Sequence, residues 1–385
     1  MQEIIRANAR YWLKVLQATP GDAQLSEADL RGAAKAIEAA LQVPNLWDVT
    51  MSLAYALHPH MERRGSYWAD WDDCLKVLAT CAWEQNDEPA DAEILLWQGV
   101  IQRQRGDFHA ATQSSHKAWQ FYRRTQNQAG LARVFSQLGD VYRLRGQFWR
   151  AESLCAAAVD LLEKQEDIED LARAENRLGL VYFDQWRYSD ALPHFLHSET
   201  LWREVDDSHG LAKVLHNLGE LHRRHRDFDK ALNYLEQAVE HYLVVGDEIY
   251  AARTRLDVGN VYLNQEDWPR AAEAYLQAET TLRHAGDSLD LAGARLNLGI
   301  VYTHMADWNE SEACFARALE QWRARGDLWR EANTLNEIAM LHLARGDRIK
   351  AKNYLDEARM LIRGRSEVPF ERLRQELAER RKLVS

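Results

Sequence analysis

The sequence predicts an all-α fold built as a solenoid, in which helical hairpins stack one after another. The first observation behind this prediction is a 40-residue repeat that aligns seven segments without a gap across residues 91–370. The second is the spacing of apolar residues inside each segment, three and four apart, which is the period of an amphipathic helix. Because each hairpin buries its apolar face only against its neighbours, such repeats form a continuous core along the stack.

Small residues recur at fixed places and define the register of the repeat. Position 2 is alanine in all seven segments, and position 9 is glycine in six of them and Ala339 in the last. The chain has only 19 glycines in 385 residues, so six in register indicate a structural requirement. Residues without a large side chain let helix backbones approach closely, and larger side chains elsewhere in the repeat fill the remaining space. These glycines are Gly99, Gly139, Gly179, Gly219, Gly259 and Gly299.

Each segment is predicted to form two helices joined by a short turn. We expect Ser189, Asp229 and Asn309 to cap second helices by accepting backbone N–H bonds. Glycines such as Gly246 are expected to end these helices in the left-handed conformation. The predicted hairpin turns lie near Asp107, Gln147, Arg187, Asp227, Asp267, Asp307 and Asp347.

The chain divides into four predicted regions. Residues 1–45 form N-terminal helices, and residues 46–90 form a degenerate helical repeat. Residues 91–370 hold the seven repeats. Residues 371–385 belong to an amphipathic helix that we expect to cover the apolar face of the last repeat, because a solenoid needs a polar cap at its end.

The repeat resembles the tetratricopeptide repeat. The family's L-G-x-x-Y and A-x-x-x-F patterns appear as Leu178-Gly179, Tyr182, Ala191 and Phe195, and they recur in the other segments. The family's usual repeat is shorter, at about 34 residues, and its terminal proline is absent here. This 40-residue variety is similar to the arrays of kinesin light chains, of spindle-orientation scaffolds and of the sensor regions of bacterial signal-transduction ATPases. The resemblance implies a right-handed α-solenoid whose first helices line a concave, ligand-binding groove.

The sequence gives no sign of catalytic chemistry. It contains no G-x-x-x-x-G-K-[ST], no H-E-x-x-H and no G-x-S-x-G motif, so we expect no enzyme activity, no cofactor and no ATPase domain. His194 and His197 lie three residues apart, a spacing that suits metal ligands, but packing explains histidines in these repeats better, and we expect no metal site.

The composition and net charge of the chain bear on its expected partners and cellular compartment. The net charge of −11 disfavours non-specific binding to nucleic acid or to an anionic membrane. No apolar run approaches the ~20 residues of a transmembrane helix, and the N-terminus has no signal-peptide pattern. The four cysteines show no disulfide framework, so the cytoplasm is the expected compartment.

The resemblance assigns the groove to positions 3, 6, 10 and 13 of the repeats. These positions are basic in the middle repeats and apolar towards the C-terminus, which favours a ligand with an acidic and a hydrophobic segment. Two alternatives stay open: the arginines pair with nearby carboxylates such as Asp140, or the C-terminal helix covers the apolar end. The candidate groove residues are Arg133, Arg143, Arg173, Asn176, Lys213, His216, Arg223, Arg253, Asn260, Leu296, Ile300 and Asn336.

The leading functional hypothesis is a non-enzymatic adaptor that binds a protein or peptide in this groove. One alternative is a sensor or regulatory module that acts with a separate ATPase, protease or transcription factor of a bacterial signalling or defence system. A further alternative is RNA or nucleotide binding through the basic stripe, which the net charge disfavours. The sequence does not specify the partner, the pathway or the oligomeric state.

Overall fold

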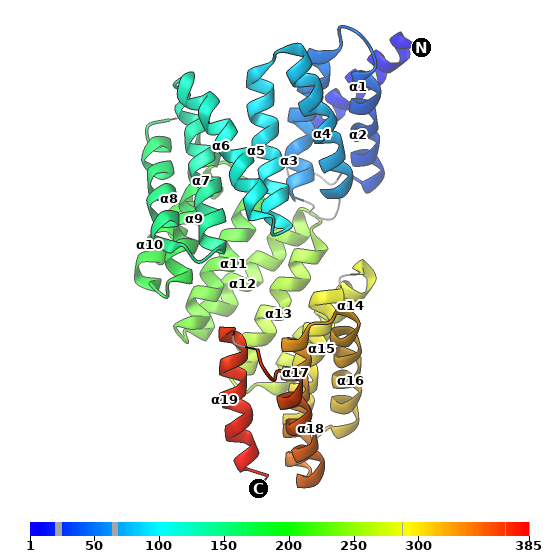
Figure 1. Cartoon of the computed structure of the whole chain (residues 1–385), viewed down its shortest axis with the longest axis vertical. Helices are drawn as coiled ribbons and strands as arrows, with labels where there is room; N and C mark the ends of the chain where they lie inside the picture. Colours follow the sequence, from blue (N-terminus) through cyan, green and yellow to red (C-terminus); the bar gives the residue numbers. More distant parts are fainter. Residues whose placement is uncertain (20–24, 64–67, 166, 287, 366, 385) are drawn as a thin grey trace. The chain divides into compact units, whose positions relative to one another are not determined.

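The computed structural model describes residues 1–19, 25–63, 68–165, 167–286, 288–365 and 367–384. Nineteen helices make up the regular structure of these residues, and none of the described residues lies in a β-strand, so the all-α prediction is confirmed (Figure 1). The helices are α1 (Gln2–Ala18), α2 (Glu27–Leu41), α3 (Trp47–Arg63), α4 (Trp68–Gln85), α5 (Glu88–Gln104), α6 (Phe108–Arg124), α7 (Gln128–Leu144), α8 (Phe148–Leu162), α9 (Ile168–Asp184), α10 (Tyr188–Glu204), α11 (Ser208–Arg224), α12 (Phe228–Val244), α13 (Glu248–Asn264), α14 (Trp268–Ala285), α15 (Ser288–His304), α16 (Trp308–Arg325), α17 (Leu328–Ala344), α18 (Arg348–Leu361) and α19 (Val368–Lys382).

The helices belong to two compact units. Unit 1 comprises residues 1–221 and 241–247, and unit 2 comprises residues 222–240 and 248–385. The boundary therefore passes through α11 and α12. Within each unit, consecutive helices pack as antiparallel hairpins, such as α7 with α8 in unit 1 and α15 with α16 in unit 2 (Figure 1).

The predicted positions of the hairpin turns are confirmed. The second helices of the seven hairpins begin at a constant interval equal to the repeat period, each directly after a predicted turn residue. Their first residues are Phe108, Phe148, Tyr188, Phe228, Trp268, Trp308 and Arg348. The predicted glycine ends are also present, since Gly286 and Gly326 close α14 and α16 in the left-handed conformation.

The predicted helix caps need correction. Asp307 caps α16 by accepting from the backbone N–H of Glu310, so Asn309 lies inside the first turn instead of at the cap. In α10 the capping position is Arg187, which makes no side-chain capping bond, and Ser189 again lies inside the helix. Ser189 and Asn309 occupy position 19 of the repeat, but each second helix begins at position 18 and the capping residue precedes its first residue, so the cap lies two residues earlier than predicted.

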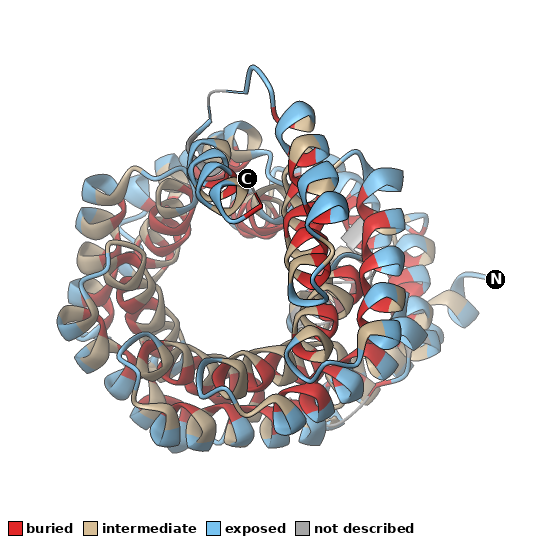
Figure 2. Cartoon of the chain, turned by 90° about the horizontal axis from the view of Figure 1, so that it is seen from below, coloured by how far each residue is buried: buried red, intermediate tan, exposed pale blue. Residues whose placement is uncertain are grey.

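Three of the recurring glycines, Gly179, Gly259 and Gly299, lie where the first helix of a hairpin meets an aromatic side chain of the second. A Cβ atom on Gly179 would lie 2.6 Å from the ring of Phe195, and one on Gly299 would lie 2.5 Å from the ring of Phe315. Both rings are almost fully buried. Figure 2 shows the buried residues gathered on the sides where neighbouring helices face one another. The register of small residues is thus a packing requirement, as the sequence predicts.

Replacing Gly179 by alanine is expected to lower the free energy of unfolding by about 1–3 kcal/mol, because the added methyl group overpacks the contact with Phe195. Gly293 offers a matched control, since it lies in α15 with no atom within 4 Å of an added Cβ. Gly293→Ala should stabilise by about 0.5–1 kcal/mol through helix propensity alone. Chemical denaturation measures both changes, and an equal effect of the two substitutions would contradict the packing explanation.

The helices that flank the repeats build two further cores. In unit 1, α1 to α5 share a cluster in which Leu57 and Trp71 are fully buried. Helices α3 and α4 occupy the stretch predicted to be a degenerate repeat. In unit 2, α19 begins at Val368 and packs against α17 and α18. Every helix that the structure describes is too short or too polar to span a bilayer.

Candidate functional site

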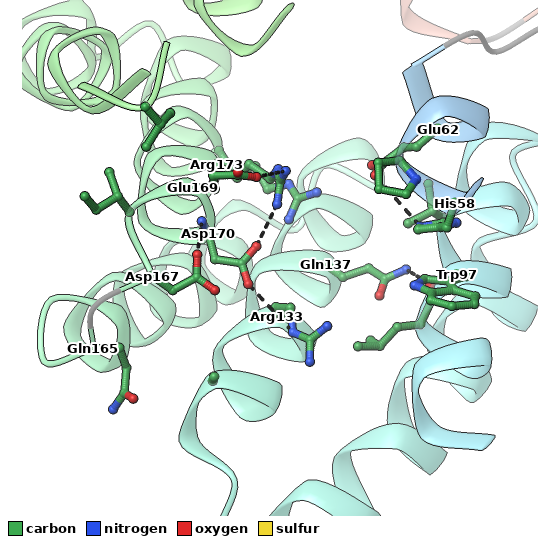
Figure 3. Close-up of a pocket in the computed structure, with 17 residues that line it drawn as sticks. His58, Glu62, Trp97, Arg133, Gln137, Gln165, Asp167, Glu169, Asp170 and Arg173 are labelled. Atoms are coloured by element: carbon green, nitrogen blue, oxygen red, sulfur yellow. Dashed lines mark hydrogen bonds and ion pairs between the residues drawn. The ribbon is translucent and has the colours of Figure 1, made fainter. Parts of the chain in front are cut away.

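A cavity of about 780 Å³ opens among the first helices of unit 1. Its walls come from α3, α5, α7 and α9, with further residues from the turn before α9 and from Val205 after α10. Figure 3 shows Glu62, His58 and Trp97 on one side and Arg173, Glu169 and Asp170 on the other. Both charge signs line the cavity, through Arg133, Arg173 and Arg177, and through Glu62, Asp167, Glu169 and Asp170.

The α3–α5 side of the cavity is an aromatic wall. The ring of His58 stacks on that of Trp97 with centroids 4.5 Å apart, and the indole N–H of Trp71 donates to His58 Nδ1 at 3.3 Å. Because Nδ1 accepts this bond, the ring of neutral His58 carries its hydrogen on Nε2. Burial lowers the pKa of His58 to about 4, so the side chain is neutral at pH 7.

Arg133 is held by a buried carboxylate. Its guanidinium donates to both oxygens of Glu93, at 2.7 and 2.5 Å, and the hydroxyl of Tyr122 donates to the same carboxylate at 2.5 Å. The Glu93 side chain is only 11% exposed. Arg133 therefore ties α7 to α5 and neutralises a buried charge, which makes it a structural residue as well as a lining residue.

Arg173 also forms ion pairs with carboxylates, but it lies at the more exposed rim of the cavity. Its guanidinium donates to Asp170 at 2.8 Å and to Glu169 at 2.9 Å, and 39% of the side chain is exposed. Arg143, which lies outside the cavity, donates to Asp140 at 2.9 Å and to Asp184 at 2.6 Å. The predicted basic stripe is therefore paired with carboxylates at these positions, which is the first of the two alternatives left open by the sequence.

Arg177 differs from the other arginines of the cavity. Its guanidinium donates to Ser136 Oγ at 2.6 Å, and among the described residues no carboxylate lies within 4 Å of it. The nearby carboxylate of Asp140 is already shared by Arg103 and Arg143. Burial lowers the pKa of Arg177, so the cavity disfavours its charge.

Glu62 is the corresponding anion on the opposite wall. Its nearest potential cation in the described part of the chain is His58, whose Nε2 lies 3.9 Å from the carboxylate and is neutral at pH 7. Burial alone would raise the pKa of Glu62, but the positive charges around it, Arg173 among them, outweigh this effect and lower that pKa to about 2. Glu62 is therefore ionised, and its side chain is 34% exposed.

Position 7 of the repeat also supplies residues that line the cavity. The sequence prediction did not place this position in the groove. Side chains at this position reach back to position 6 of the preceding repeat: Arg177 to Ser136, Gln137 to the backbone carbonyl of Leu96, and Asn217 to Asn176. A sequence signal existed, because position 7 is polar in six successive repeats, Gln137 to Glu337. No such signal marks His58 or Glu62, which lie outside the regular repeats.

The remaining predicted groove residues of the middle repeats lie on first helices but not in this cavity. Asn176 accepts from Asn217 at 2.8 Å, while Lys213 and His216 lie on α11. In unit 2, Arg253 on α13 donates to Asp290 at 2.5 Å. Arg223 donates to Asn264 at 3.3 Å, and Asn260 accepts from Tyr275 at 2.7 Å. The hydrogen bonds named here all join neighbouring helices.

The C-terminal candidates lie in a covered region. Asn336 is fully buried, and its amide donates to Glu376 of α19 at 3.1 Å. Leu296 and Ile300 pack against the core cluster to which α19 contributes Leu373 and Leu377. The helix thus covers the apolar face of the last repeat, which is the second alternative left open by the sequence, and Asn336 is not an open groove residue.

The two histidines at metal-ligand spacing share one carboxylate. His194 Nδ1 lies 2.6 Å from one oxygen of Glu175, and His197 Nδ1 lies 2.8 Å from the other. Within the described ranges there is no cluster of three or more histidine, cysteine, aspartate or glutamate side chains arranged to hold a metal ion.

The repeats match the models of a known protein family. A family model described as tetratricopeptide repeat matches residues 170–243 and 290–361, and a second model with the same description matches residues 216–286. No curated protein sequence matches the chain.

Solved structures share the fold at low sequence identity. The STAND signal-transduction ATPase with a tetratricopeptide repeat sensor from Pyrococcus horikoshii is 14% identical, with a TM-score of 0.68 over 94% of this chain and 56% of that one. The Rap conjugation gene regulator of plasmid pLS20, solved with the Phr* peptide, is 16% identical over 99% of this chain and 98% of that one, with a TM-score of 0.53. BtubC (BKLC) from P. vanneervenii is 23% identical over 58% of this chain and 92% of that one, with a TM-score of 0.50.

Proposed function

Because residues 170–286 and 290–361 match family models of the tetratricopeptide repeat, we propose that the chain is a non-enzymatic adaptor that binds a peptide or protein partner in the cavity of unit 1. The observation that carries the proposal is the cavity itself, which combines an aromatic wall with unpaired charges on first helices. Concave sites with an apolar surface and a few directed polar groups are the usual form of ligand pockets. The four free cysteines support a reducing cytoplasm as the compartment.

The proposal differs from the long, two-part ligand track that the sequence favours. The arginines at position 3 that line the cavity are paired, and the apolar positions near the C-terminus pack into cores with α19. We therefore propose that the ligand is held mainly by the cavity residues of α3, α5, α7 and α9. The solved complex of the Rap regulator with a peptide supports a peptide as the ligand class.

Filling the cavity is expected to abolish partner binding. Ala129 lines the cavity near the start of α7, and Ala129→Trp would occupy its space without changing a charge. Ala316→Trp on the exposed face of α16 is a matched control. Affinity capture from the native host with quantitative mass spectrometry should recover the same partners with the wild type and the control, and lose them with Ala129→Trp. Retention of those partners by Ala129→Trp would place the binding site elsewhere.

A second candidate function is a sensor module that controls a separate effector. It is favoured by the similarity in fold to the sensor-bearing STAND protein and to the Rap regulator. The same capture experiment separates the two candidates, since a sensor is expected to recover an ATPase, protease or transcription factor whose activity changes when the cavity is filled.

A further inference from the structure

The cavity of unit 1 contains two charges of opposite sign that have no charged group within ion-pair distance in the described part of the chain. Arg177 on α9 has Ser136 as its hydrogen-bond partner and no carboxylate of the described chain within 4 Å. Among the described residues, Glu62 on α3 has only the neutral ring of His58 within 4 Å, at 3.9 Å, and the more distant guanidinium groups of Arg173 and Arg177 keep it ionised. The neighbouring charged residues are different, because Arg133 and Arg173 each form ion pairs with carboxylates. The two charges come from different helices and line the same space.

The position of Arg177 is unfavourable for its charge in the empty protein, whereas Glu62 is kept ionised by the positive charges around it. A charge removed from water is stabilised only by an opposite charge or by hydrogen bonds, and the described residues offer Arg177 a single hydroxyl acceptor. Arg177 and Glu62 attract each other across the cavity but form no ion pair within 4 Å in the described chain, unlike Arg133 and Glu93. Residues left in this state in a cavity are typical of sites that a ligand completes.

We infer that the cavity recognises a mixed-charge peptide segment, with a carboxylate of the ligand against Arg177 and an ammonium or guanidinium group against Glu62. The inference rests on the proposed function and specifies the chemistry of its ligand. Arginine pairs carboxylates through two parallel hydrogen bonds, which gives direction as well as affinity. Trp97 provides an apolar surface for the part of the peptide between the two charges. The two ligand charges come either from side chains of a longer segment or from the free termini of a short peptide.

The ligand-free protein gives a first test of Arg177. Since the cavity disfavours its positive charge, Arg177→Gln is expected to raise the melting temperature. Arg145→Gln, an exposed residue outside the cavity, makes the same charge change and should leave the melting temperature unchanged. An unchanged or lower value for Arg177→Gln would identify a structural residue and overturn its assignment as a ligand anchor.

Binding to defined peptide pools tests both charges. The probes are hexapeptide pools with blocked termini and two fixed positions, occupied by Glu and Arg, by two Glu, by two Arg or by two Gln, with the other positions randomised. A fifth pool carries two Gln and free termini. Calorimetry is expected to show that the wild type binds the Glu/Arg pool or the free-terminus pool roughly tenfold or more tightly than the blocked Gln pool. The preferred pool then identifies the source of the charges.

The variants decide between the outcomes. Arg177→Gln and Glu62→Gln should each lose that gain, whereas Arg145→Gln and the exposed Glu163→Gln should keep it. Equal binding of the mixed-charge and Gln pools by the wild type, or wild-type binding by Arg177→Gln and Glu62→Gln, would overturn the inference. Loss of all binding in Ala129→Trp together with such a result would leave the proposed function standing, whereas binding that Ala129→Trp does not affect would contradict the proposed function itself.

Discussion

Replacing Arg133 by methionine is expected to lower the free energy of unfolding by about 3 kcal/mol or more. The guanidinium neutralises the carboxylate of Glu93, which is 11% exposed and also accepts from Tyr122. Methionine keeps the packing of the side chain but leaves that buried charge without compensation. Urea denaturation of the variant measures the loss, and hydrogen exchange should place it in α5 and α7.

A double variant isolates the pair. In Arg133→Met with Glu93→Gln the buried charge is gone while the acceptor for Tyr122 remains, so most of the stability should return. Arg124→Met serves as a control for the loss of a surface ion pair, since Arg124 and Glu88 are 61% and 62% exposed, and it should change stability by less than about 1 kcal/mol. Similar losses in Arg133→Met and Arg124→Met would refute the role given to burial.

The expected destabilisation means that reversing the charge of Arg133 is not a specific test of ligand binding by the basic stripe. Reversing Arg133 to glutamate places a third acidic side chain beside Glu93 and Asp170, so lost binding in such a variant would report lost folding. Arg177 avoids this difficulty, because no carboxylate of the described residues depends on it for an ion pair. The arginine that the sequence favours as a binding residue is thus the structural one, and the arginine that it did not assign to the groove is the better probe of function.

The architecture of the repeats was predictable because its cause lies within single segments. Gly179 meets Phe195 of the same hairpin, and the same pair of positions recurs as Gly299 with Phe315. A fixed local contact leaves a fixed pattern of small and large residues in the sequence. The helix caps were predicted two residues too late because no such fixed contact marks them: aspartate and serine are common on both sides of a helix start.

The cavity was not predictable in the same way. Two of its arginines have partners in a neighbouring repeat, Arg133 in Glu93 and Arg177 in Ser136, whereas Arg173 pairs within its own helix, and which of these partners each arginine meets depends on helix rotation. Glu62 and His58 come from α3, where the repeat pattern is too weak to give a register. Periodicity therefore identified the helix face that lines the cavity, whereas the structure was needed to show which charged residues lack an ion-pair partner.

Removing the side chain of Leu377 is the second change for which we expect a large effect. Leu377 and Leu373 lie one turn apart on α19, with exposures of 0% and 3%, and share a core cluster with Leu335 and Leu355. Arg380 on the same helix donates to Glu337 of α17 at 2.9 Å. Leu377→Ala should lower the free energy of unfolding of this end of unit 2 by about 2–4 kcal/mol, as is usual for a buried leucine.

The location of the loss is as informative as its size. Repeats couple mainly to their nearest neighbours, so hydrogen exchange should accelerate in α17 and α18 while unit 1 is unchanged. Gln375→Ala, on the exposed side of α19, should alter neither stability nor exchange. Helix α19 covers Asn336 and adjoins the core on which Leu296 and Ile300 pack, and none of these residues lines the cavity of unit 1. Leu377→Ala should therefore leave peptide binding in unit 1 intact. Lost binding in this variant would show that the ligand depends on the C-terminal repeats, and would contradict the assignment of the site to the cavity of α3, α5, α7 and α9.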